Sequence, residues 1–489
     1  MSSVAIGFIV YLLIIFTVGV LTARLNKSLP DYLLAGRRLG PWVVAFSERA
    51  SAESGWMLLG LTGLAYASGL GDPSGTRLEP ALWTGLGGVA GVIAAWFLVA
   101  KRLRQESERL GALTIPRFFE LRFRGQDTTM RFAATGIIAF CFAFYIAAQF
   151  DAAGKSLEQT LGWGHFTGVI AAALIIVFYT AMGGFFAVAW TDFFQGWIMI
   201  GTLVLLPLVT VAELGGWGVL ADKLTAINPQ LLTPSAGRTG WTLTAGILGG
   251  FGVGLGYLGQ PHLMARYMSI RSTDDIATAR RVAIVWSIFS YGGAVLMGLA
   301  ALAYFGVGHF DDPEMMMPAL AISLLPAWLV GIIISGALAA MMSTADSQLL
   351  VTTSAVAEDV YHASLNPNAD QKQLMLVSRV ATIILGLLAI ALSQLPQSIF
   401  RKVLFAWAGL GAAFGPAMVL SLWWPGTTRN GVLAGMLTGF FTVIIWDNSA
   451  WGSRLYSLVP GFLVALVVNV VVSLLERGKP ASIGVVPTE

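Results

Sequence analysis

Long apolar segments recur thirteen times along the 489-residue chain, and this recurrence constrains its fold more than any other feature. A helix needs about 20 consecutive apolar residues to cross the hydrocarbon core of a bilayer. Only 11% of the residues are charged, against about 25% in an ordinary soluble protein. This excludes a soluble globule, a nucleic-acid-binding protein and a disordered scaffold. The sequence predicts an all-α polytopic membrane protein with spans at 4–23, 41–70, 81–100, 128–152, 163–182, 185–212, 241–265, 280–306, 326–357, 374–394, 403–423, 430–447 and 456–475.

The distribution of basic residues predicts how these spans are oriented. Loops after odd-numbered spans hold 21 lysines and arginines, Arg266 among them, and the other loops hold 7. Because basic residues favour the cytoplasmic side, we expect the N-terminus outside and the C-terminus in the cytoplasm. No basic residue precedes the first apolar segment, which favours a retained span over a cleaved signal peptide. No loop is long enough for a separate domain, so residues 1–489 are expected to form a single membrane domain.

One basic residue belongs to neither set of loops. Arg49 lies inside the second span, beside Glu48 and four residues before Glu53. Charges at membrane depth are costly and usually face a cavity or a partner. Arg49 and Glu53 share a helix face and can pair if the helix continues there. A self-neutralising structural pair and a direct role in transport both remain open.

Two spans are poor continuous helices. Small residues and charges interrupt the second span at Ser47–Gly55, and the seventh holds six glycines from Gly249 to Gly259, just before Pro261. Glycine loosens a helix and proline removes a backbone donor. Two interrupted helices five spans apart are typical of inverted-repeat transporters, whose sites lie at the unwound points. For the seventh span, close packing against neighbouring helices is the alternative.

Polar side chains also form a stripe in the ninth span. Ser343, Asp346 and Ser347 follow i, i+3, i+4 spacing, and Thr344 adjoins them. Hydroxyl and carboxylate oxygens suit a small hard cation such as sodium. The alternative is that the hydroxyls bond back to helix carbonyls, although that leaves the buried charge of Asp346 unexplained. Asp192, near the start of the sixth span, is either a first-turn helix cap or another cation or proton site.

Other chemistry finds little support in the sequence. It contains no Walker-type phosphate loop, zinc-ligand spacing or nucleophile elbow, so we expect neither an enzyme nor an ATP-driven pump. The four histidines lie mostly at or beyond span ends and do not cluster, and Cys141 is expected to be a packing residue. Coupling to an ion gradient is the remaining energy source.

Several long motifs resemble the sodium/solute symporter family, most closely its bacterial sodium/proline branch. The resemblance covers nearly the whole chain and is carried by DYLLAGRRLGPW after the first span, ASAESGWMLLG, GGFFAVAWTDFFQ, GYLGQPHLMARYMS, LAAMMSTADSQLLVTTSAVAEDVY and FAWAGLGAAFGPAMVLSLWW. It implies a LeuT-type 5+5 inverted repeat, with repeats at 41–212 and 241–423, one extra helix before and two after.

The resemblance also implies functional residues. A sodium site is implied at the carbonyls of Ala50, Glu53 and Ala340 with the side chains of Ser343 and Thr344. A second cation or coupling site falls at Asp192, with Asp346 and Ser347 able to share it, and Arg37 matches a functional arginine near the cytoplasmic mouth. The implied substrate pocket consists of Ser54, Gly55, Trp56, Tyr145, Tyr257 and Pro261.

The chain departs from the proline branch at several of these positions. The branch has aspartate at Ala52, an apolar residue at Glu53 and tryptophan at Val253. In addition, Asp346 replaces a hydroxyl residue, and Glu48 and Arg49 replace small ones. These changes bear on the ion stoichiometry and the charge of the substrate, and the loss of tryptophan at Val253 enlarges one pocket wall.

The resulting expectation is a sodium-coupled importer of proline or a related small amino acid in the bacterial cytoplasmic membrane. Its expected partners are sodium, a small solute and the bilayer, with no cofactor, nucleic acid or obligatory protein partner. The alternatives are a proton-coupled or non-proline symporter of the same fold, a solute channel, and a transport-like sensor. The sensor is disfavoured because no signalling domain follows the last span.

Overall fold

The computed structural model describes residues 28–76, 78–123 and 128–476, together with positions 10, 11, 13, 17, 18, 21 and 22. Within these ranges, ten helices are long and apolar enough to cross a membrane. Two further predicted spans contain the shorter apolar helices Trp56–Ser68 and His165–Phe178. The predicted first span, 4–23, lies largely outside the described residues. The all-α polytopic architecture is confirmed.

The helices follow the predicted spans closely. Within 41–212 the spans are α3 (Pro41–Ala52) with η2 (Trp56–Leu61) and α4 (Thr62–Ser68), α5 (Ala81–Ala95) with η3 (Trp96–Ala100) and α6 (Lys101–Arg109), α8 (Thr129–Leu161), and α9 (His165–Leu214). Within 241–423 they are α11 (Gly240–Leu255) with η5 (Gly256–Gly259) and α12 (Pro261–Ser269), α13 (Ile276–Phe305), α15 (Ala327–Ser354) with η7 (Ala355–Leu365), α16 (Gln371–Ser393) and α17 (Ile399–Trp423). The repeat boundaries themselves stay a prediction.

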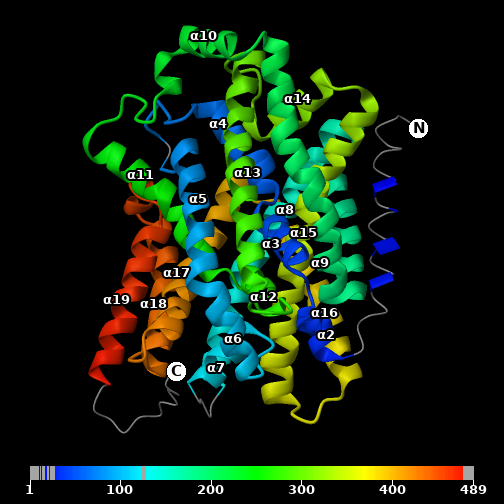
Figure 1. The fold of residues 1–489 in the computed structure, drawn as a ribbon, viewed down its shortest axis with the longest axis vertical. Helices are drawn as coiled ribbons and strands as arrows, with labels where there is room; N and C mark the ends of the chain where they lie inside the picture. Colours follow the sequence, from blue (N-terminus) through cyan, green and yellow to red (C-terminus); the bar gives the residue numbers. More distant parts are fainter. Residues whose placement is uncertain are drawn as a thin grey trace.

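The remaining elements complete the bundle and its two ends. Helices α18 (Arg429–Asp447) and α19 (Leu458–Leu475) pack on α17 at one side (Figure 1). The connecting elements are α2 (Leu29–Leu34), η1 (Ala35–Arg37), α7 (Ile115–Arg122), α10 (Trp217–Ile227), η4 (Pro229–Leu232), η6 (Pro313–Met315), α14 (Met316–Leu324) and η8 (Ala450–Ser453). Helices α10 and α14 lie at one end of the bundle, and α2, α6 and α7 lie at the other (Figure 1).

Two helices break in the middle of the bundle, as predicted. Helix α3 ends at Ala52, and Glu53 leaves the helical conformation with φ −105° and ψ 49° before η2 begins. Gln260 is extended, and Pro261 then starts α12. Helix α3 packs against α9, α12, α13 and α15. Both breaks therefore lie inside the protein rather than at its surface.

The glycines of α11 serve packing as well as the break. A Cβ on Gly254 would lie 2.1 Å from the carbonyl oxygen of Gly87 in α5, and one on Gly256 would lie 1.9 Å from Nε1 of Trp407. Neither distance leaves room for a side chain. Close packing therefore accounts for these two glycines, while Gln260 and Pro261 mark the interruption.

Helix α9 joins two predicted spans almost without a loop. It runs from His165 to Leu214, with Gly184 at φ +61° and ψ −175°. That positive φ suits a residue without a Cβ. The chain changes direction at Gly184, between the segments predicted at 163–182 and 185–212.

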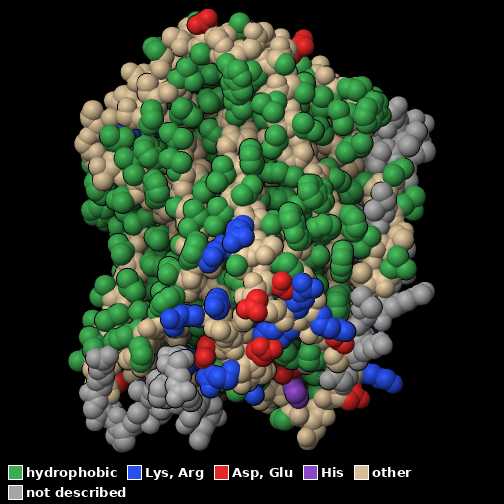
Figure 2. Space-filling model, in the orientation of Figure 1, with side chains coloured by type: hydrophobic (Ala, Val, Ile, Leu, Met, Phe, Trp, Pro, Cys, Tyr) green, Lys and Arg blue, Asp and Glu red, His purple; other side chains and the backbone are tan. Residues whose placement is uncertain are grey.

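Charged side chains gather toward one end of the molecule. Figure 2 shows an apolar belt over most of the visible face and a cluster of Lys, Arg, Asp and Glu toward the end that holds α2, α6 and α7. The interior holds charge as well, since Arg49 and Arg266 are among its largest fully buried side chains.

Candidate functional site

The predicted sodium ligands of α3 and α15 meet at the broken end of α3. The Ser343 hydroxyl lies 3.2 Å from the carbonyl oxygen of Ala50 and 2.9 Å from that of Ala340. The Thr344 hydroxyl lies 3.0 Å from the carbonyl oxygen of Ser51 and 3.1 Å from that of Ala340. Carbonyls in the last turn of a helix lack intrahelical partners, so the end of α3 supplies free oxygens to α15.

Glu53 differs from the other predicted ligands. Its backbone N–H donates to the carbonyl of Arg49, and its side chain accepts a 2.5 Å hydrogen bond from Nε1 of Trp286 in α13. The side chain thus contacts a different helix from the one that carries Ser343. Ser51, which the sequence did not single out as a ligand, also brings its carbonyl oxygen to the group.

Asp192 lies in a second polar cluster between α3, α9 and α12. Its Oδ2 accepts hydrogen bonds from Ser47 at 2.6 Å, Ser51 at 3.2 Å and Arg266 at 3.0 Å. It lies well inside α9, two turns beyond the bend at Gly184. The first-turn cap interpretation was therefore wrong, and Asp192 links three helices.

Arg266 is the largest correction to the sequence analysis, which assigned it to a loop. It is 0% exposed and donates to Ser51 at 2.8 Å, to the carbonyl of His262 at 2.8 Å, and to Ser347. The helix that restarts at Pro261 carries its guanidinium into the core. The sequence does contain one indication that Arg266 belongs to a helix. It lies one helical turn after His262, so both residues lie on one face of α12.

The third member of the predicted second site, Asp346, is only partly satisfied. Its Oδ1 accepts from the Ser347 hydroxyl at 3.2 Å. Asp346 Oδ2 and Asp192 Oδ1 are buried without a hydrogen bond. Two carboxylates thus accompany one guanidinium, which leaves an excess of negative charge when both are ionised.

A separate charged cluster surrounds Arg49. Its Nε donates to Glu48 Oε2 at 2.6 Å, its Nη2 also bonds Glu48, and its Nη1 lies 3.6 Å from Glu53 Oε1. Glu48 also accepts from Trp96 at 3.2 Å and from Tyr267 at 3.1 Å. The predicted Arg49–Glu53 proximity is present, but the closer partner is Glu48.

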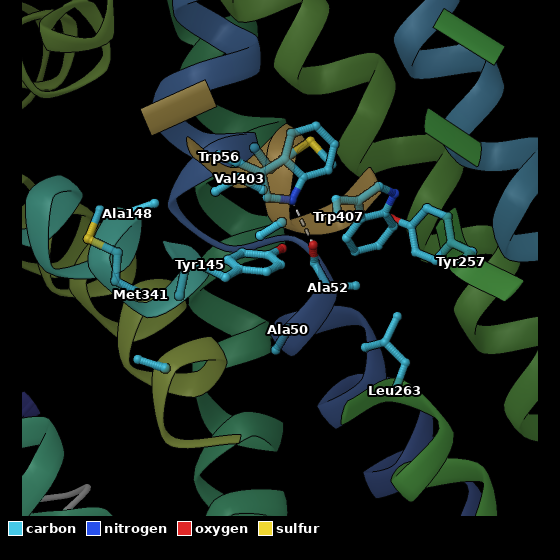
Figure 3. Packing of buried hydrophobic residues seen from close by; sticks show 14 of the residues in the cluster. Ala50, Ala52, Trp56, Tyr145, Ala148, Tyr257, Leu263, Met341, Val403 and Trp407 are labelled. Carbon is cyan, nitrogen blue, oxygen red and sulfur yellow. Dashed lines mark hydrogen bonds between the residues drawn. The ribbon is translucent and has the colours of Figure 1, made fainter. Parts of the chain in front are cut away.

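The predicted substrate residues also converge at the two breaks. Gly55 N–H donates to Gln149 of α8 at 3.1 Å, and Trp56 Nε1 donates to the carbonyl of Ala52 at 2.8 Å. Figure 3 shows Trp56, Tyr145 and Trp407 around the segment that follows Ala52. Pro261 starts the helix beyond the second break. All six predicted pocket residues are buried.

Tyr257 connects this pocket to the Arg49 cluster. Its hydroxyl is 2.6 Å from that of Tyr291, its ring centroid is 4.8 Å from that of Trp407, and Arg49 lies 5.0 Å from its ring centre. Trp407 donates in turn to the carbonyl of Val253 at 2.8 Å. An aromatic side chain therefore occupies the neighbourhood of the position where the related branch has tryptophan.

We expect Tyr257→Ala to raise the substrate concentration for half-maximal uptake by at least tenfold, since truncating a central aromatic contact residue commonly costs about 2 kcal/mol or more of binding free energy. Tyr257→Phe keeps the ring and loses only the bond to Tyr291, so it should stay within about fivefold. Initial uptake rates at saturating sodium measure both. If Tyr257→Ala leaves the half-saturating substrate concentration unchanged, Tyr257 does not contribute to the substrate pocket.

Arg37 holds one end of the bundle together. Its guanidinium donates to the carbonyls of Met268 at 2.8 Å, Ser107 at 3.1 Å and Ala112 at 2.7 Å. Burial lowers the pKa of Arg37 to about 10, so it remains charged at neutral pH. Arg37 thus ties the segment before α3 to α12 and to the α6–α7 connection.

The opposite end carries its own ion pairs above the pocket. Lys155 of α8 lies 2.6 Å from Asp312 and 2.6 Å from Glu314, and Lys402 of α17 lies 2.6 Å from Asp151. A hollow of about 390 Å³ is lined by residues that include Asp151, Lys155 and Asp312. The neighbouring element η6 packs against α4 and against η2, which begins at Trp56.

The sequence matches the sodium:solute symporter family model over residues 32–439. The chain belongs to this family. As a sodium:solute symporter it is a multi-pass membrane protein and a secondary transporter rather than an enzyme, and it couples sodium to the movement of a small solute.

Characterised members of the sodium:solute symporter family resemble the chain over nearly its full length. The sodium/proline symporter of Escherichia coli (strain K12) is 38% identical over 98% of this chain and 95% of its own. The high-affinity proline transporter PutP of Bacillus subtilis (strain 168) is 38% identical over 95% and 97%. The osmoregulated proline transporter OpuE of the same organism is 36% identical over 98% and 96%.

Solved structures share the fold of this symporter at lower identity. A Na⁺-coupled sialic acid symporter in a substrate-bound outward-open state superposes with a TM-score of 0.79 at 18% identity, covering 98% of this chain and 99% of the other. MhsT in complex with L-phenylalanine gives a TM-score of 0.55 at 15% identity, covering 89% and 98%. The LeuT-like fold expected from the sequence is confirmed.

Proposed function

We propose that this symporter couples inward sodium movement to the uptake of proline or a related small amino acid. The observation that carries the proposal is the break of α3. Its last-turn carbonyls meet Ser343 and Thr344, and the next residues, Ser54–Trp56, form the proposed pocket with Tyr145 and Tyr257. Ion and solute would thus bind to the same short stretch of backbone. The names of the relatives support proline as the first solute to test.

Sodium bound at this position would bridge two helices. The proposed ligands are the carbonyls of Ala50, Glu53 and Ala340 with the hydroxyls of Ser343 and Thr344. An ion held by α3 and α15 favours the conformations in which these helices are close, and in those conformations the backbone of Ser54–Trp56 is fixed. Sodium would therefore raise solute affinity by shifting the population toward binding-competent states.

Proton coupling is the second candidate, and the unpaired carboxylate oxygens of Asp192 and Asp346 favour it. These two residues, with Ser347, are the proposed second cation or coupling site. A protonated carboxylic acid can donate a hydrogen bond that the ionised form cannot. The same two groups can therefore accept either a proton or a metal cation.

Uptake into proteoliposomes tests the proposed function. With labelled proline, an imposed inward sodium gradient should drive transient accumulation above equilibrium, and a proton gradient without sodium should not. Accumulation driven by the proton gradient and not by the sodium gradient would show that the protein is coupled to protons rather than to sodium. A panel of small amino acids and sugars, each with and without sodium, tests the solute, and accumulation of a sugar alone would contradict the amino-acid proposal.

We propose a bacterial cytoplasmic-membrane location with the N-terminus outside and the C-terminus in the cytoplasm. The charge cluster at the end that holds α2, α6 and α7 supports this orientation. The chain allows a direct test because its one cysteine, Cys141, is buried. A cysteine placed at exposed Asp274, between α12 and α13, should resist an impermeant thiol reagent in intact cells. Rapid labelling would show that the protein has the opposite orientation.

A further inference from the structure

His262 is a fully buried histidine whose two ring nitrogens both lack a hydrogen bond within the described structure. An interior polar group without a partner costs about 1–3 kcal/mol, and most such groups have a partner in the protein or in bound water. His262 therefore differs from an ordinary packing residue. The sequence analysis placed the histidines mostly at span ends, and the restart of the helix at Pro261 is what brings this one into the core.

The ring lies at the wall of the proposed pocket. His262 follows Pro261 directly in the first turn of α12. Its ring centroid is 5.3 Å from that of Phe142 and 6.1 Å from that of Tyr145, both on α8. The main chain of Ser51, at the end of α3, also lies beside the ring, at a separation longer than an ordinary hydrogen bond. The imidazole thus lies between the two broken helices and α8.

Two other polar groups near it also lack partners. The hydroxyls of Tyr145 and Ser54 are buried and lie beside each other, at a separation longer than an ordinary hydrogen bond. All three groups are hydroxyl or imidazole, whereas the nearest cation, Arg266, is already paired with Asp192. What this part of the pocket lacks is a set of hydrogen-bond donors and acceptors rather than a counter-ion.

We propose that His262 binds the polar headgroup of the transported solute, and that this headgroup is a net-neutral zwitterion. The inference rests on the proposed function and specifies its substrate class. A neutral imidazole presents one N–H donor and one acceptor nitrogen, and each hydroxyl can act in both ways. A carboxylate beside an ammonium or imino group requires this mixture. A solute with net charge would bring an unpaired charge into the buried site.

Three substitutions at His262 test the proposal in proteoliposomes at saturating sodium. His262→Leu and the shorter His262→Asn should each raise the half-saturating proline concentration about tenfold, the effect of losing a buried hydrogen bond. His262→Gln, which keeps a donor and an acceptor at similar reach, should stay within about threefold. His309→Gln, a histidine that stacks on Phe305 outside the pocket, should match wild type.

A second readout separates binding from a general structural effect. Prolinamide carries a positive charge and no carboxylate, so the wild type should discriminate strongly against it as a competitor of proline uptake. His262→Leu and His262→Asn should narrow that discrimination, while half-saturating sodium and the melting temperature without solute stay near wild type. If His262→Leu fails to insert into the membrane, the discrimination of His262→Asn between proline and prolinamide tests the proposal.

The outcomes distinguish this inference from the function on which it rests. Uptake of no amino acid by wild-type protein would contradict the proposed function and the zwitterion class together. Wild-type protein could take up proline normally while all His262 variants keep the same half-saturating proline concentration and the same discrimination against prolinamide. That result would overturn the role of His262 alone, and bound water would then be the partner of its nitrogens. Narrowed discrimination with the Leu and Asn variants, restored by Gln, supports the proposal.

Discussion

Asp192→Asn is expected to destabilise the protein by about 3–5 kcal/mol and to abolish most uptake, because it breaks the direct ion pair that Arg266 forms in the buried core. The two side chains are each 0% exposed and lie 3.0 Å apart. Asp346 remains as a second carboxylate, but it forms no direct salt bridge with Arg266 in the described structure. Chemical unfolding in detergent measures the stability, and labelled-solute uptake measures the function.

The double variant Asp192→Asn/Arg266→Gln removes both charges of the ion pair and should recover part of the lost stability, since Asp346, the carboxyl that remains, can become neutral by binding a proton. The exposed pair Arg271–Asp275, 2.6 Å apart, provides a matched control. Asp275→Asn should change stability by less than about 1 kcal/mol. Wild-type stability and uptake in Asp192→Asn would show that the buried pair is dispensable.

Ser343→Ala and Thr344→Ala are each expected to raise the half-saturating sodium concentration by about tenfold or more, with the maximal rate at saturating sodium much less affected. Each removes one oxygen from the group at the end of α3, and the loss of one buried polar contact is worth about 1–2 kcal/mol. Initial uptake rates over a range of sodium concentrations at fixed solute measure the effect.

Helix α15 contains its own control for these two variants. Ser335 is buried in the same helix, and its hydroxyl donates to the carbonyl of Gly331 at 2.7 Å. Ser335→Ala should leave half-saturating sodium unchanged. Thr344→Ser, which keeps the hydroxyl, should restore most of the affinity. Equal sodium dependence in Ser335→Ala and Ser343→Ala would argue against the proposed ion site.

Local sequence signals predicted the interruptions of both broken helices. Small residues and charges around Ser47–Gly55 are incompatible with an ordinary apolar helix, and Pro261 removes a backbone donor at the second break. Arg49 stood out for the same reason, because a charge within an apolar run has few explanations. These features depend on residues close together in the chain, which is why sequence reasoning reached them.

Contacts between distant segments were beyond that reasoning. Arg266 and His262 follow Pro261 near the end of a predicted span, and the packing of α12 against α3, α6 and α15, with His262 against α8, buries them. The carbonyl of Glu53 was predicted to be a sodium ligand, but the sequence did not indicate that its side chain accepts a hydrogen bond from Trp286, 233 positions later. Hydropathy gives the length of a span but not which neighbour covers its last turns, so such partners emerge from the folded structure.

The charge balance of the core has an electrical consequence. Four buried carboxylates, Glu48, Glu53, Asp192 and Asp346, surround two buried arginines, Arg49 and Arg266. With all of them ionised, these six side chains carry two excess negative charges, and one bound sodium ion leaves one. A membrane potential contributes about 2.3 kcal/mol per elementary charge per 100 mV. We therefore expect a cell interior that is negative to push the empty sites outward, and charge movement recorded without solute on supported membranes would reveal that step.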